Sequence, residues 1–151
     1  DYSVLCIFHS SDQTAWIGTT EGLFVYTPKL RKLAHFDNAS DQQLSNNVVM
    51  SVFEDNKKNI WVGTIDGLNK MQKNGVMKTY YFKERTGGDE IADSTTRSSA
   101  IKNMYSIINN YGGNTIRKIM QDYNGNLWIG TDMELIIFNP ESGNLLIIKK
   151  I

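Results

Sequence analysis

The sequence has one cysteine, no long apolar run and no excess of charge of either sign. Cys6 is the lone cysteine among 151 residues, which excludes an internal disulfide bond. Sixteen Lys and Arg residues balance sixteen Asp and Glu residues, and their scattered placement argues against nucleic acid or an anionic membrane surface as a partner. The longest apolar runs have about five residues, whereas a membrane-spanning helix needs about 20. We therefore expect no membrane contact by this segment.

Metal ligands are equally scarce. The two histidines, His9 and His35, lie in predicted strands, and neither belongs to a cluster with metal-ligand spacing. Cys6 falls in the apolar run 4–8, where a small buried hydrophobic residue is the expected role. The sequence thus predicts no metal site, no cofactor and no catalytic residues.

One phrase of four residues, Trp-Ile-Gly-Thr or Trp-Val-Gly-Thr, occurs at 16–19, 61–64 and 128–131. The first two tryptophans are 45 residues apart and the last two 67 apart, so an insertion of about 22 residues precedes the third copy. The similarity between the copies extends to the positions six residues before and seven residues after each tryptophan. These positions carry Ser10, Asp55 and Asp122, then Leu23, Leu68 and Leu135. Self-similarity at such a period indicates an array of structural repeats.

Each repeat divides into four short apolar or β-branched segments separated by turn residues. The segments are 4–8, 15–19, 23–27 and 33–36; then 48–54, 60–64, 68–72 and 77–82; then 116–121, 127–131, 135–138 and 145–149. Four antiparallel strands at a period near 45 are typical of a β-propeller blade. A sandwich or barrel also uses many short strands, but does not repeat a Trp-Gly-Thr phrase.

We therefore predict an all-β fold, an incomplete propeller of three four-stranded antiparallel blades. Blade one covers about 4–36, blade two about 48–82 and blade three about 115–149. The insertion, about 83–113, separates the last two blades. Residues 101, 104, 105 and 108 follow helical spacing in it, so a short helix is expected there.

Six repeated residues are assigned structural roles because each recurs at one position of the repeat. The tryptophans are expected to pack between neighbouring blades, and the glycine two residues after each lets the next blade approach closely. These residues are Trp16, Trp61 and Trp128, with Gly18, Gly63 and Gly130. Gly22 and Gly67 fit a turn with positive φ, and Glu134 at the equivalent position predicts a different third turn.

The pattern Asp-x-x-Gly-x-Leu-Trp-Ile-Gly-Thr, complete at 122–131, resembles the two-component regulator propeller repeat. The segments Thr64-Ile-Asp-Gly-Leu68 and Leu44-Ser-Asn-Asn-Val48 resemble it as well. Two departures are Glu134 in place of glycine, and Ser10 with Thr14 in place of the Asp and Asn of the first turn. The resemblance covers nearly the whole chain outside 83–113.

Such repeats form the extracytoplasmic sensor region of hybrid two-component histidine kinases of Bacteroidetes. The resemblance implies a periplasmic, non-enzymatic sensor that detects an oligosaccharide, within a parent protein whose kinase domains are absent from this chain. It carries no catalytic residues over to this sequence.

Three blades leave the flat faces of the first and last blade uncovered, and propellers close with four to eight blades. An exposed apolar face of that size needs a partner. We expect either the remaining blades of a parent sensor or a second copy of this chain, giving a six-bladed homodimer.

Ligand-binding candidates come from one rim of the predicted blades. The turns between second and third strands and the blade-to-blade connections meet at this rim, because chain direction alternates within a blade. Carboxylates, amides and tyrosine rings there suit sugar hydroxyls and ring faces. The candidates are Glu21, Asp66, Asp132, Asn46, Asn47, Tyr105 and Tyr111.

Two rival classes stay open. One is a scaffold resembling the quinoprotein-like propellers of envelope assembly, which generally lack the Trp-Ile-Gly-Thr phrase. The other is a glycan-active propeller enzyme, but the four arginines form no visible cluster with an acid–base pair.

Overall fold

The computed structural model describes residues 1–39, 43–82 and 114–148. These residues form three separate four-stranded antiparallel sheets, each built from strands consecutive in the chain. The prediction of three four-stranded blades is confirmed. The helix expected within 83–113 lies outside the described residues.

The strand bounds differ from the predicted ones by at most two residues. The first sheet contains β1 (Val4–His9), β2 (Ala15–Thr19), β3 (Gly22–Thr27) and β4 (Lys32–Phe36). The second contains β5 (Val49–Glu54), β6 (Ile60–Thr64), β7 (Gly67–Met71) and β8 (Met77–Tyr80). The third contains β9 (Ile116–Gln121), β10 (Leu127–Thr131), β11 (Leu135–Phe138) and β12 (Leu145–Ile148). A 3₁₀ turn, η1 (Pro28–Leu30), which the sequence analysis did not predict, joins β3 to β4.

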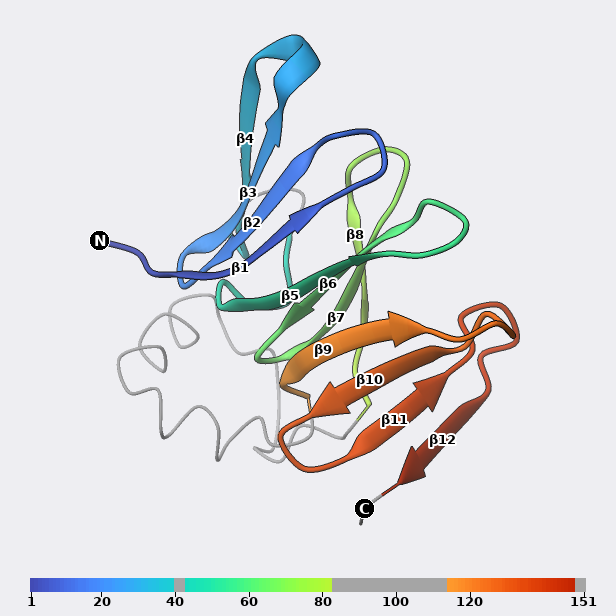
Figure 1. Cartoon of the computed structure of the whole chain (residues 1–151). Helices are drawn as coiled ribbons and strands as arrows, with labels where there is room; N and C mark the ends of the chain where they lie inside the picture. Colours follow the sequence, from blue (N-terminus) through green and yellow to red (C-terminus); the bar gives the residue numbers. More distant parts are fainter. Residues whose placement is uncertain (40–42, 83–113, 149–151) are drawn as a thin grey trace.

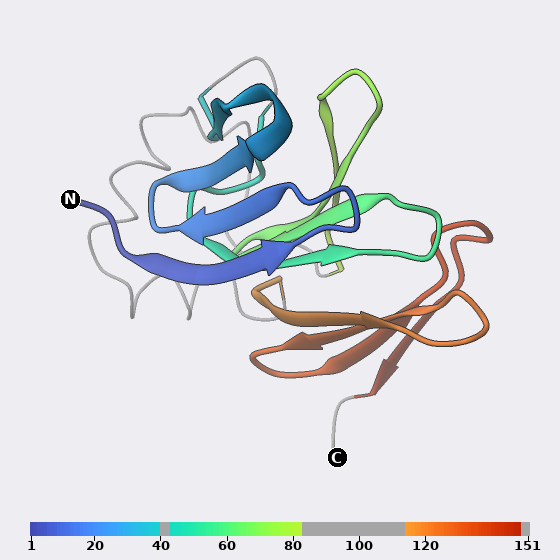
Figure 2. The ribbon, with the colours of Figure 1, turned by 45° about the horizontal axis from the view of Figure 1, so that its top comes forward.

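The sheets follow one another face to face in chain order (Figures 1 and 2). The first strands of the three sheets are neighbours, with β5 between β1 and β9. This arrangement gives the second sheet one face toward the first sheet and the other face toward the third. We call the boundary between the first two sheets the first seam, and the boundary between the last two the second seam.

Apolar side chains fill both seams. Trp16 and Leu23 of blade one pack with Val49 and Val62 of blade two in the first seam. In the second seam, Trp61 and Leu68 of blade two pack with residues of blade three. The latter are Ile116, Ile119, Leu127, Ile129, Ile136 and Phe138. Because burial of apolar area is the main favourable term in folding, the seams hold the blades together.

The threonine of the repeated phrase closes the turn between second and third strands. Thr19 Oγ1 donates to the Gly22 carbonyl at 2.8 Å, and Thr64 Oγ1 donates to the Gly67 carbonyl at 3.1 Å. Gly22 and Gly67 have φ of 117° and 116°, which confirms the predicted positive φ. Thr131 Oγ1 makes the equivalent bond to Glu134, which is absent from the positive-φ residues. The third turn therefore differs, as predicted.

Candidate functional site

The turns between first and second strands form one rim of the molecule, which we call the tryptophan rim (residues 10–14, 55–59 and 122–126). In blade two, Asp55 Oδ1 accepts bonds from the backbone N–H groups of Lys57 and Asn59, both at 2.9 Å. Its Oδ2 accepts from the Trp61 indole N–H at 2.9 Å. Asp122 accepts the same set of bonds in blade three, including that from Trp128 at 2.9 Å. In blades two and three, the repeated aspartate thus ties the turn to the tryptophan of the second strand.

Blade one reaches the same result with different residues. The Trp16 indole N–H donates to Ser10 Oγ at 2.9 Å, and Ser10 Oγ donates to Asp12 Oδ1 at 2.7 Å. Asp12 also accepts from the Thr14 backbone N–H at 3.0 Å. A carboxylate two residues further along therefore replaces the one missing at position 10.

These contacts set the acidity of the turn carboxylates. Hydrogen bonds from Trp128 and Asn126 lower the pKa of Asp122 from 3.8 to about 2. Burial raises the pKa of Asp55, but the bonds from Trp61 and Asn59 outweigh it, and the pKa is lowered overall. Both carboxylates are held as anions by hydrogen bonds within their own turns, so they are poor candidates for general acid–base catalysis.

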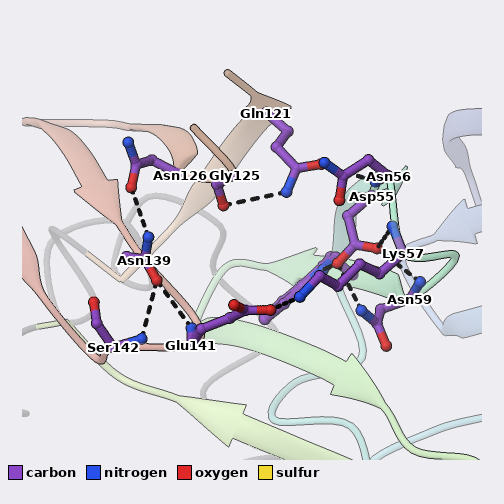
Figure 3. A network of polar contacts seen from close by, with 11 residues as sticks. Asp55, Asn56, Lys57, Asn59, Gln121, Gly125, Asn126, Asn139, Glu141 and Ser142 are labelled. Atoms are coloured by element: carbon purple, nitrogen blue, oxygen red, sulfur yellow. Dashed lines mark hydrogen bonds and ion pairs between the residues drawn. The ribbon is translucent and has the colours of Figure 1, made fainter. Parts of the chain in front are cut away.

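A polar pocket of about 230 Å³ opens on the tryptophan rim across the second seam (Figure 3). Its walls come from the turns of blades two and three, with Lys70 of β7 and Gln121 of β9 between them. Lys57 and Glu141 form an ion pair across it. The amides of Asn56 and Asn124 also line it, and neither side chain is hydrogen-bonded within the described residues. Balanced charge and free amides suit a neutral ligand rich in hydroxyl groups.

The predicted ligand residues lie on the opposite rim, which we call the connection rim (residues 20–21, 65–66, 132–133 and 37–47). Glu21 is exposed there. Asp132 forms an ion pair with Arg117 at 2.5 Å, whereas Asp66 is buried. Tyr105 and Tyr111 lie outside the described residues. Ligand binding by this set stays a prediction.

Asn46 and Asn47 carry structural hydrogen bonds. Asn46 Oδ1 accepts from the Val48 backbone N–H at 2.9 Å, and Asn47 Oδ1 accepts from that of Asn38 at 2.7 Å. Asn114 repeats the role of Asn47, because its Oδ1 accepts from the Phe82 N–H at 3.0 Å. This shared role could have been predicted from the sequence, because Asn47 and Asn114 each stand two residues before the first strand of a blade, β5 or β9.

Metal-binding geometry is not found in the described ranges. No group of three or more His, Cys, Asp or Glu residues there could hold a metal ion. No helix in the same ranges is long and apolar enough to cross a membrane. The arrangement offers binding surfaces made of turns on a rigid frame.

Three four-stranded antiparallel sheets packed face to face in chain order define a segment of a β-propeller. Within that class, two segments of the chain are similar to the two-component regulator propeller repeat. The family model described as two component regulator propeller matches residues 43–66 and 110–133. Each matched segment contains the first strand of a blade, the turn after it and the Trp-x-Gly-Thr phrase. No curated protein matches the chain significantly.

Solved structures share the fold at low sequence identity. The extracellular domain of the putative hybrid two component system BT3049 from B. thetaiotaomicron has a TM-score of 0.68 and 21% identity, over 99% of this chain and 17% of that one. The corresponding domain of BT4673 from the same organism has a TM-score of 0.67 and 23% identity, over 92% and 16%. This chain therefore spans about a sixth of those domains.

A propeller enzyme is also similar in fold. A catalytically inactive virginiamycin B lyase from Staphylococcus aureus, solved with quinupristin, has a TM-score of 0.66 and 13% identity, over 99% of this chain and 42% of that one. Identities of this size show shared architecture and carry no shared chemistry.

Proposed function

We propose that this chain is a segment of a non-enzymatic sensor propeller that binds an oligosaccharide outside the inner membrane. The parent protein would be a hybrid two-component histidine kinase, with its kinase domains elsewhere in the chain. The observation that carries the proposal is the match of residues 43–66 and 110–133 to the two-component regulator propeller repeat. The likeness to extracellular domains of hybrid two-component systems supports the extracytoplasmic location.

The surface chemistry supports a carbohydrate ligand. The connection rim presents an exposed carboxylate at Glu21, and the pocket on the tryptophan rim presents the free amides of Asn56 and Asn124. Amide and carboxylate groups on rigid turns hydrogen-bond hydroxyl groups without needing a charged ligand. A binding signal could pass to the kinase only if the ligand prefers one of two states of the sensor.

A titration with product analysis tests this proposal. Neutral oligosaccharides are titrated calorimetrically into this chain and into the complete extracytoplasmic region of the parent, and the mixtures are then separated by chromatography. Saturable binding with recovery of intact sugar is the expected result. Appearance of shortened or unsaturated products would contradict a non-enzymatic sensor, and failure of every sugar to bind the complete region would contradict the ligand class.

Two substitutions then locate the ligand. Asn124→Ala should weaken binding in the pocket on the tryptophan rim, whereas Glu21→Ala should weaken binding on the connection rim. Asn144→Ala is the matched control, because Asn144 is exposed, lies in a nearby turn and does not line the pocket. Equal affinities for all three variants would exclude both places.

A further inference from the structure

One lysine of blade two departs from the repeat on the side that faces the second seam. The residue paired directly opposite the tryptophan, on the third strand of each blade, is Val25, Lys70 or Ile137. Val25 is buried in the first seam, so the position suits a branched apolar side chain. A cation there loses solvent without adding apolar area to the seam. Packing between blades therefore gives no reason for Lys70.

The Lys70 ammonium group also has donors that the fold does not use. Its Nζ lies 5.3 Å from the centroid of the Trp61 ring, whose face attracts the positive charge. Within residues 1–39, 43–82 and 114–148, no ion pair or hydrogen bond joins this ammonium to another residue. An ammonium group carries three N–H donors. Lys70 therefore brings free donors to the pocket on the tryptophan rim, which it lines.

Both blades at the second seam supply further polar groups to the same pocket. Asn56 of blade two and Asn124 of blade three line it with their amides. Lys57 and Glu141, which pair across it (Figure 3), have side chains that are 61% and 66% exposed. An ion pair this exposed contributes little to stability, so a ligand can separate it at low cost. The pocket thus presents hydrogen-bond donors and acceptors from two blades.

The charge and size of the pocket define the ligand. Its charged side chains are Asp55, Lys57, Lys70 and Glu141, and their formal charges sum to zero. Trp61 is 0% exposed, so recognition depends on hydrogen bonds rather than on stacking against its ring. The volume of about 230 Å³ lies below the range of about 300–1,000 Å³ that holds drug-sized ligands. One neutral ring rich in hydroxyl groups fits these limits.

We propose that this pocket binds one ring of a neutral oligosaccharide and that Lys70 fixes the ring by donating hydrogen bonds to its oxygen atoms. The proposal rests on the proposed function and deepens it, because it assigns the binding site and a residue that determines affinity. Since the walls come from blades two and three, the bound ring contacts both blades. Binding therefore favours the closed state of the second seam.

Calorimetric titration of the complete extracytoplasmic region of the parent tests this assignment. The neutral probes are galactotriose, cellotriose, maltotriose and mannotriose, and trigalacturonate is the anionic counterpart of the first. Lys70→Val should weaken binding of the neutral probe at least about tenfold, because hydrogen bonds from a charged donor are lost. Its melting temperature should be unchanged or raised, since valine is the residue that blade one carries at this position.

Lys78→Val is the matched control. Lys78 lies directly opposite Lys70 in the sheet, and its Nζ is 5.0 Å from the centroid of the Tyr80 ring. It does not line the pocket, so this variant should bind the neutral probe as the unmodified region does. Unchanged affinity of Lys70→Val would overturn the assignment and leave the proposed function standing. Binding of no neutral probe would overturn both, and tighter binding of trigalacturonate would overturn the neutral class.

Hydrogen exchange with and without the bound neutral probe tests the bridging of the two blades. Protection should rise in both turns that line the pocket, 55–59 of blade two and 122–126 of blade three. The turn 10–14 of blade one should be unaffected, because it does not line the pocket. Added protection in one blade only, or in neither, would overturn the proposed bridge across the second seam.

Discussion

In blades two and three, the aspartate that begins the turn on the tryptophan rim bonds both the backbone of that turn and the indole of the second strand. Asp55 satisfies two backbone N–H groups of its own turn, the Asn59 amide and the indole of Trp61, which is fully buried. Removing it leaves a buried indole N–H without an acceptor, and such a group costs more than an ordinary hydrogen bond contributes.

Asp55→Ala should therefore lower the free energy of unfolding by about 2–3 kcal/mol. Asp12→Ala should cost less, because Asp12 is exposed and reaches Trp16 only through Ser10. Urea unfolding followed by tryptophan fluorescence measures both. A larger loss for Asp12→Ala would contradict the roles assigned to the two carboxylates.

Asp122 makes stability depend on acidity. Its pKa falls from 3.8 in a free chain to about 2 in the fold, so the folded state favours the ionised carboxylate. The contribution of the Asp122 carboxylate to the free energy of unfolding is complete above the pKa of the unfolded chain, 3.8. It is lost as the pH falls through the folded-state pKa of about 2.

Stability of the chain should accordingly decline between about pH 4 and pH 2. Melting temperatures measured over this range should fall less steeply for Asp122→Asn, which keeps a side-chain oxygen but has no charge to titrate. Asn144→Ala serves as the control, because it changes an exposed side chain without removing or adding a titrating group. The same slope in Asp122→Asn and the unmodified chain would show that Asp122 is not responsible.

The first strands of blades two and three, β5 and β9, pack against the preceding blade, which is distant in sequence. Gly63 and Gly130 occupy the same position of the repeat, but only Gly63 has another blade against it in the described structure. Gly63→Ala should therefore destabilise the chain by about 1–3 kcal/mol through overpacking against Ile116, while Gly130→Ala should leave the monomer nearly unchanged. Chemical denaturation in dilute solution measures both, and similar losses for the two would contradict the close contact assigned to Gly63 and Ile116.

Strand positions were predictable because each strand is short, β-branched or apolar, and bounded by turn residues, as in 60–64 followed by Gly67. Trp16, Trp61, Gly18 and Gly63 lie in the seams, and the repetition of each at one position of the repeat is what suggested a structural role. Trp128 and Gly130 face the open end of blade three and have no further blade against them in the described structure.

Other features depend on geometry that spacing alone does not reveal. In the first turn, Ser10 and Asp12 together take the place of the aspartate. This could not be predicted from spacing, because it depends on Ser10 Oγ bonding both the Trp16 indole and the Asp12 carboxylate. The hydrogen bonds from the Ser11 N–H to Glu54 and from the Asn56 N–H to Gln121 join different blades, so they depend on blade-to-blade register. The pocket on the tryptophan rim was missed for the same reason, because its walls come from turns of two blades.

The whole molecule is a run of blades that is well packed in its centre and open at its ends. Blade two has a neighbour on both faces, whereas blades one and three each have one uncovered apolar face. Local opening should follow this pattern, because segments with fewer buried apolar contacts open at lower free energy.

Hydrogen exchange resolved along the chain tests this account most directly. The account predicts that β6 and β7 of blade two, which is packed on both faces, exchange more slowly than the strands of blades one and three. Uniform protection across the three blades would contradict it.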